Sequence, residues 1–199
     1  MRPPARFSAL LIGLLACITL VVHVRLGLAR RPELTLIEEL WRTGRYFTIL
    51  TVAILAAHFT WIGLRGRLHA AAAGAVTLWI AIVGGVYHAL LWRPLEGARL
   101  IVDHSMHTAL PLLAALWWLT FAPKAALRPA HALWWLAWPG LYVVYVLARG
   151  AVDGRHPYFF VDPPRIGWPM VGLWIGALAA IFTLAGLALV ALGRRLSRT

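Results

Sequence analysis

The chain has 199 residues, of which 61% are hydrophobic and only 13% are charged, and its formal net charge is +12. A soluble domain keeps about a quarter of its residues charged, so this composition excludes a soluble globular protein. The positive charge comes from arginines spread between apolar blocks instead of gathered on one face or in one tail. This spread argues against a nucleic-acid partner and favours lipid headgroups as the partners of the arginines.

The first apolar block follows Arg2 and Arg6, a pattern that also occurs in secretory signals, with Ala29 near a cleavage point. The stretch that ends at Cys17, the single cysteine, faintly resembles a lipoprotein site. The apolar run nevertheless continues to Val24, which is long enough to span a bilayer. Because further blocks of this kind follow, we expect the first helix to be retained.

Apolar blocks of the length that a membrane-spanning helix needs recur along the whole chain. They are Phe7 to Val24, Tyr46 to Leu64, His69 to Trp92, His104 to Phe121, Ala132 to Leu147 and Trp168 to Leu192. Pro139 and Gly140 interrupt the fifth block and predict a kink there. The connectors are short and no linker or repeat stands out. The sequence therefore predicts an all-α membrane bundle of six transmembrane helices, forming a single domain over residues 1–199.

The loops on the two sides of this bundle differ in their acidic residues. The side that holds the N-terminus has nine Lys or Arg residues and no acid, whereas the other has ten Lys or Arg residues and all seven acids. The positive-inside rule counts Lys and Arg, which makes the two sides nearly equal. The short turn with Arg65 and Arg67 and the tail with Arg194 and Arg195 are hard to translocate, so we expect both termini in the cytoplasm. The composition is typical of a GC-rich bacterial gene, which indicates a bacterial inner membrane.

Six alternating helices bring several polar residues to the membrane face away from the N-terminus. They are His23, Thr48, Tyr87, His88, residues 103–108 and the loop 156–164. Polar groups inside a bilayer are costly, so their gathering at one depth indicates a site. Side-chain amides cannot provide hydrogen bonds at buried positions, because the chain contains no Asn and no Gln.

Within this group Thr48 is the candidate nucleophile and His107 its candidate base. Thr48 lies two residues into the second predicted helix and His107 three residues into the fourth, so the two lie at similar depth. A threonine hydroxyl needs a base within hydrogen-bond reach. Asp103 lies at i−4 from His107 and could orient its imidazole. A plainer interpretation stays open, since threonines in membrane helices commonly bond their own backbone or a neighbouring helix.

The histidines allow a second interpretation. His104 and His107 have the i, i+3 spacing that can place two ligands on one metal, and His58 lies in the middle of the second helix. A membrane cytochrome holds haem between two histidines that face each other at equal depth. His58 has no clear partner at its depth, so we expect it to pack between helices with its ring bonded to a backbone carbonyl. We expect no metal and no cofactor.

Three short motifs resemble those of the androgen-induced membrane hydrolases. They are Phe47-Thr48-Ile49, His104-Ser105-Met106-His107-Thr108 with Pro111, and Pro157-Tyr158-Phe159-Phe160-Val161-Asp162. That family is multi-pass and hydrolyses fatty acid esters of hydroxy fatty acids with an essential Thr and His. The resemblance runs from about Trp41 to the last helix, and it implies that Thr48 is the nucleophile and His107 the histidine. Asp103 departs from the family pattern, in which animal members carry an Asn.

The resemblance implies a lipid ester hydrolase, and the remaining polar residues suggest how one would work here. The oxyanion would be held by backbone N–H groups at a helix start, by Ser105, by Tyr158 or by an arginine. Arg42 or Arg45 could pair with a fatty carboxylate, although both also suit headgroup anchoring. The alternative from a different class is a non-catalytic lipid-binding membrane protein.

Overall fold

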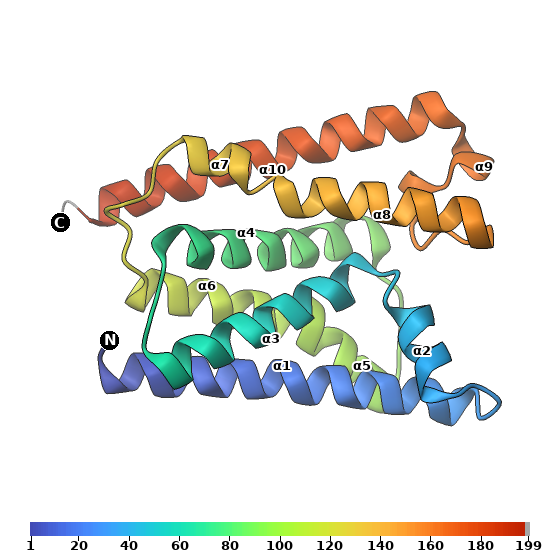
Figure 1. The fold of residues 1–199 in the computed structure, drawn as a ribbon, viewed down its shortest axis with the longest axis horizontal. Helices are drawn as coiled ribbons and strands as arrows, with labels where there is room; N and C mark the ends of the chain where they lie inside the picture. Colours follow the sequence, from blue (N-terminus) through green and yellow to red (C-terminus); the bar gives the residue numbers. More distant parts are fainter. Residues whose placement is uncertain (198–199) are drawn as a thin grey trace. The chain divides into compact units, whose positions relative to one another are not determined.

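The computed structural model describes residues 1–197, and these form helices joined by short connectors, with no strand (Figure 1). The predicted all-α membrane bundle is thereby confirmed. The helices separate into two compact units, residues 1–123 and the residues from 124 onward, and each unit is described by itself below. The single domain predicted over residues 1–199 stays a prediction.

The first unit contains four long helical runs and one short surface helix. Its elements are α1 (Pro3–Arg30), α2 (Leu36–Thr43), α3 (Phe47–Arg65), α4 (Ala70–Val86), the π-helical η1 (Tyr87–Leu91), α5 (Gly97–His104), the π-helical η2 (Ser105–Ala109) and α6 (Leu110–Phe121). Helix α1 packs along α3, α3 packs on α4, and α4 packs on α6. Gly13 allows the close approach of α1 and α3, because a Cβ there would lie 2.5 Å from Oγ1 of Thr60.

The second unit is built from two long helices and short turns. Its elements are α7 (Ala130–Trp134), α8 (Ala137–Asp153), the 3₁₀ turn η3 (Phe159–Val161), α9 (Pro163–Ile166) and α10 (Trp168–Leu196). The interruption predicted at Pro139 and Gly140 occurs just before them, at residues 135–136. Pro139 then stands in the first turn of α8, where its missing N–H costs no helical hydrogen bond.

Five helices in the described part of the chain are long and apolar enough to cross a membrane. They are Pro3–Arg30, Phe47–Arg65, Ala70–Leu91, Ala130–Asp153 and Trp168–Leu196, and each contains or closely matches a predicted window. The predicted window His104 to Phe121 lies in the unbroken helical run 97–121, which η2 divides into α5 and α6. The predicted count of six is therefore approximate: five long apolar helices and one divided run.

Candidate active site

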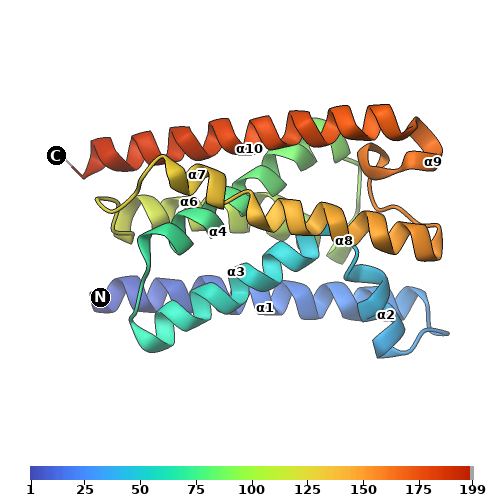
Figure 2. The same ribbon diagram turned by 45° about the horizontal axis from the view of Figure 1, so that its top comes forward.

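The candidate site lies in the first unit, at the end away from the N-terminus. The end of α1, the short helix α2, the start of α3, the end of α4 and the start of α5 all lie there in both views (Figures 1 and 2). Alternation of the long helices therefore gathers the polar residues of these segments at one end of this unit, as the sequence predicts.

Thr48 and His107 come together at this end. Oγ1 of Thr48 lies 3.4 Å from Nε2 of His107, and both side chains are half-buried. The other ring nitrogen of His107, Nδ1, lies 3.0 Å from the backbone oxygen of Asp103. A carbonyl oxygen can only accept a hydrogen bond, so Nδ1 carries the proton. Nε2 is then the unprotonated nitrogen that faces the threonine hydroxyl, which is the tautomer that a general base requires.

The side chain of Asp103 supports the same imidazole. Its Oδ1 lies 3.4 Å from Nδ1 of His107, and its carboxylate also accepts a hydrogen bond from the hydroxyl of Tyr87. Burial raises the pKa of Asp103, but the hydrogen bonds to His107 and Tyr87 and the charges of His107 and Arg93 outweigh it and hold the pKa below its ordinary value. Asp103, which precedes the apolar window, is therefore ionised at neutral pH.

Two π-helical segments meet at the site. The ring of Tyr87, in η1, stacks on that of His107, in η2, with centroids 3.8 Å apart. His88 and Thr108, which directly follow Tyr87 and His107, form a second contact between the two segments. Nε2 of His88 lies 3.0 Å from Oγ1 of Thr108. Pro111 follows η2 and lacks the N–H that would bond the carbonyl of His107 in a regular α-helix. Such local π-turns are frequent at functional sites.

The two side chains named from the sequence as oxyanion candidates belong to different units. Oγ of Ser105 donates to the backbone oxygen of Ile101 at 2.8 Å, so the hydroxyl serves its own helix. Tyr158 belongs to the second unit, where its ring stacks on Phe160, and its oxyanion role stays a prediction. The N–H groups of Thr48 and Ile49, in the first turn of α3, have no acceptor within their own helix and are further candidates.

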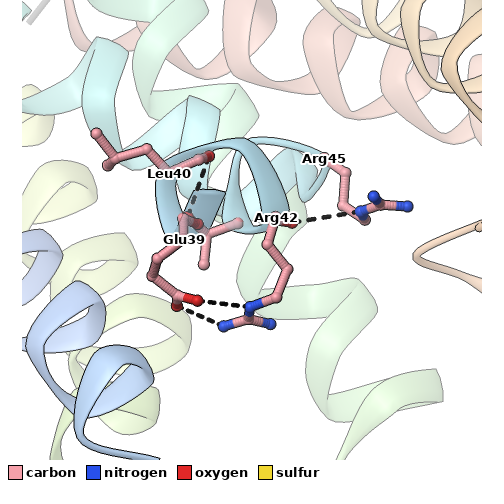
Figure 3. A network of polar contacts seen from close by, with 5 residues as sticks. Glu39, Leu40, Arg42 and Arg45 are labelled. Atoms are coloured by element: carbon pink, nitrogen blue, oxygen red, sulfur yellow. Dashed lines mark hydrogen bonds and ion pairs between the residues drawn. The ribbon is translucent and has the colours of Figure 1, made fainter. Parts of the chain in front are cut away.

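The two arginines proposed for a substrate carboxylate lie in a polar network around α2 (Figure 3). Nε of Arg42 donates to Glu39 at 2.7 Å, and its NH2 group binds the second oxygen of the same carboxylate. The hydrogen bond to Glu39 raises the pKa of Arg42 above its ordinary value. Nε of Arg45 donates to the backbone oxygen of Arg42 at 3.3 Å. Arg42 thus has a carboxylate partner within the chain, and Glu39 is fully buried although the sequence places it in a loop.

The other histidines take different positions. His104 is exposed, whereas His107 faces Thr48. Nε2 of His58 is buried and has no hydrogen-bond partner among residues 1–197, so this nitrogen does not make the bond to a backbone carbonyl that was expected of the ring. Within the same residues, no group of three or more His, Cys, Asp or Glu side chains is arranged to hold a metal ion.

Comparison with known proteins identifies no relative of the chain: no protein-family model, no curated protein and no solved structure matches it. Function is therefore argued from the site itself. Sequence reasoning had named Thr48, His107 and Asp103 as neighbours, and the structure brings the three together. It had not singled out the pairing of Thr108 with His88 or the stacking of Tyr87 on His107. The positions of Tyr87, His88 and Thr108 in the polar group at the same end, Thr108 directly after His107, were the available signal.

Proposed function

We propose that the chain is an intramembrane lipid ester hydrolase with Thr48 as nucleophile and His107 as general base. One observation carries the proposal: Thr48 Oγ1 lies within reach of a histidine nitrogen whose partner nitrogen is held by a carbonyl. A nucleophile, a base and a group that orients the base form the arrangement on which hydroxyl-dependent acyl transfer relies. Asp103 adds a charge that stabilises the imidazolium formed during the reaction.

The reaction would proceed in two balanced steps. In the first, Thr48 Oγ attacks the ester carbonyl while His107 Nε2 takes the hydroxyl proton, and the collapsing tetrahedral intermediate expels the alcohol, which receives that proton. In the second, His107 takes a proton from water as the oxygen of that water attacks the acyl-threonine carbonyl; the intermediate then collapses, breaking the bond to Thr48 Oγ, and His107 returns the proton to Thr48 Oγ as the fatty acid leaves. The first-turn N–H groups of α3 would hold the oxyanion in both steps.

The substrate class follows from the setting of the site and from the resemblance to the androgen-induced hydrolases. Long apolar helices build the unit that holds Thr48 and His107, so a lipid can reach the site from the side. We propose fatty acid esters of hydroxy fatty acids, or similar lipid esters, as substrates. We place the chain in a bacterial inner membrane with both termini in the cytoplasm, on the basis of its basic turn and basic tail.

The deciding experiment compares variants in a detergent assay with a branched fatty acid ester and a fluorophosphonate probe. Thr48→Ala and His107→Ala should each lower hydrolysis by more than roughly 10³-fold, because paired catalytic residues act as a unit. Thr48→Ser should keep part of the activity and of the probe labelling, because the hydroxyl remains while the methyl that fixes its rotamer is lost. Full activity of folded Thr48→Ala would sink the nucleophile assignment and favour the non-catalytic lipid-binding alternative.

The matched control addresses the second Thr–His pair. Thr108→Val and Thr48→Val make the same chemical change at neighbouring places, and both keep a β-branched side chain. Thr108→Val should leave hydrolysis within about threefold of the wild type, whereas Thr48→Val should abolish it. The reverse result would move the nucleophile to Thr108. A Soret absorbance of the purified wild type would instead support the haem interpretation.

A further inference from the structure

Tyr87 lies at the centre of the contacts around His107, although the reaction proposed above gives it no role. Its side chain is buried, with 5% exposed. One face of its ring covers the imidazole, with the two ring planes inclined by only 13°. Its hydroxyl hydrogen-bonds to the Asp103 carboxylate and to the backbone of Arg93 in the connector after η1. A buried tyrosine with both its ring and its hydroxyl engaged has a single available orientation.

The contacts of the hydroxyl have a fixed direction. A backbone N–H can only donate, so the Tyr87 oxygen accepts from Arg93 and gives its own proton to Asp103. The Asp103 carboxylate therefore stays beside Nδ1 of His107 at 3.4 Å. The result is a continuous series of polar contacts that ends at Nδ1 of His107, the ring nitrogen opposite the one that faces Thr48.

The ring of Tyr87 restricts a different motion. A half-buried imidazole can turn about its Cβ–Cγ bond, and terminal torsions of this kind have broad energy wells. A ring stacked at 3.8 Å blocks that rotation on one side. Rotation by half a turn would exchange Nδ1 and Cδ2 and would lose both contacts to Asp103.

We propose that Tyr87 is a positioning residue that holds the His107 imidazole in the plane and tautomer that present Nε2 to Thr48. It acts on His107 through the stacked ring and on Asp103 through the hydroxyl. As a statement about turnover this rests on the proposed hydrolase function. As a statement about the geometry of His107 it does not.

The test is built so that these two statements can fail separately. Protein labelled with ¹⁵N at histidine, in detergent at a pH of about 8 where an ordinary imidazole is neutral, reports which ring nitrogen carries the proton. The His107 signals are assigned by their loss in His107→Gln. Wild type should show a single His107 tautomer with the proton on Nδ1. Tyr87→Leu, which removes ring and hydroxyl, should show mixed tautomers.

Tyr87→Phe separates the two contacts because it keeps the stacked ring and loses the hydroxyl. It should shift the Nδ1 signal, since Asp103 loses a donor, while Nδ1 stays protonated through the backbone oxygen of Asp103. The matched control is Tyr145→Phe, which removes a hydroxyl bonded to Arg149 in the second unit and should leave the His107 signals unchanged. His107 signals that are identical in wild type, Tyr87→Phe and Tyr87→Leu would overturn the proposal.

Kinetics provide the second readout. Tyr87→Phe should lower kcat by roughly 5- to 10-fold and Tyr87→Leu by roughly 10²-fold, because a displacement of about 1 Å in a reacting group costs about that much. KM should stay within about twofold in both, since Tyr87 does not bind substrate in this scheme. A rise in KM at unchanged kcat would contradict the positioning role. If Thr48→Ala hydrolyses ester normally, the hydrolase proposal fails while the ¹⁵N spectra still decide the role of Tyr87.

Discussion

Two threonine–histidine pairs lie side by side, and distance alone would select the pair that is not the proposed one. The Thr108–His88 pair is shorter, at 3.0 Å against 3.4 Å for Thr48–His107. Of the two histidines, only His107 has a partner for its second ring nitrogen among the described residues, the backbone oxygen of Asp103. That contact fixes the tautomer of His107. His88 is exposed and makes an edge contact with Tyr87 instead. An oriented base is worth more to catalysis than a few tenths of an ångström, which can close when substrate binds.

Asp103 contributes to His107 in two ways, and a single substitution separates them. Asp103→Asn removes the carboxylate charge but keeps the backbone oxygen that lies 3.0 Å from Nδ1. We therefore expect kcat to fall by about 10-fold, which corresponds to about 1.4 kcal/mol of lost stabilisation of the imidazolium. The tautomer should persist. Turnover and thermal unfolding are measured together, and unchanged turnover would leave a Thr/His dyad without a charged third member.

At the scale of whole elements, the position of His107 depends on how closely η2 approaches α4. A Cβ at Gly84 would lie 2.8 Å from the backbone oxygen of His107, so alanine there must push η2 away. Gly84→Ala should lower turnover by roughly 10²-fold, because the Thr48–His107 distance increases. Gly85→Ala is the matched control, because a Cβ at that neighbour meets nothing within 4 Å. Equal activity of the two variants would show that the helices adjust without moving the base.

Helix α2 holds the chain just before Thr48, and a buried ion pair fixes it. Glu39 is fully buried and closes against Gly27 of α1, where a Cβ would clash with its carboxylate. Exposed Leu36, Ile37 and Trp41 leave the opposite face apolar, as suits a helix in the headgroup region. The inner face of α2 therefore places the Glu39 carboxylate, paired with Arg42 of the same helix, against Gly27 of α1, and the outer face presents apolar side chains.

Glu39→Gln should destabilise the first unit by roughly 2–3 kcal/mol, because Arg42 keeps its charge after the buried carboxylate is lost. Glu38→Gln, one residue away, should cost less than about 0.5 kcal/mol, since its exposed side chain caps α2 with Thr35 and glutamine can serve the same capping box. Thermal denaturation in detergent measures both. If Glu39→Gln and Glu38→Gln lost similar stability, the burial of Glu39 would not increase the cost of removing its charge.

The sequence predicted the elements of this site better than its contacts. Apolar windows located the long helices because a spanning segment must be continuous, and helix alternation then brought Thr48 to the depth of His107. The sequence did not show which face of each helix points to the core of the bundle, because lipid and core both favour apolar side chains. The stacking of Tyr87 depends on two π-helical segments, and the burial of Glu39 depends on the missing side chain of Gly27, so neither follows from local pattern.

At the scale of the whole chain, the proposed orientation rests on the basic turn with Arg65 and Arg67 and on the basic tail, because Lys and Arg are nearly equal in number on the two sides. If the divided run 97–121 crosses the membrane together with the five long apolar helices, the number of crossings is even and both termini lie on one side. Of the four polar segments on that side, none contains an Asp or Glu. Arg6 also caps the end of α3 there, donating to the backbone oxygens of Gly63 and Leu64. Arginines held near a helix end at the cytoplasmic surface both satisfy carbonyls and resist translocation.

We therefore expect the C-terminus to lie in the cytoplasm, so that only a reporter that is active in the cytoplasm gives a signal when it is fused there. A reporter inserted after Gly154, which ends α8 in a left-handed turn with open space around it, should be active only outside. Alkaline phosphatase and green fluorescent protein fusions give the two readouts, because the first needs an oxidising compartment for its disulfides. The opposite pattern at both positions would invert the orientation. Activity of the same reporter at both positions would contradict the odd number of crossings between them and would require α10 not to span.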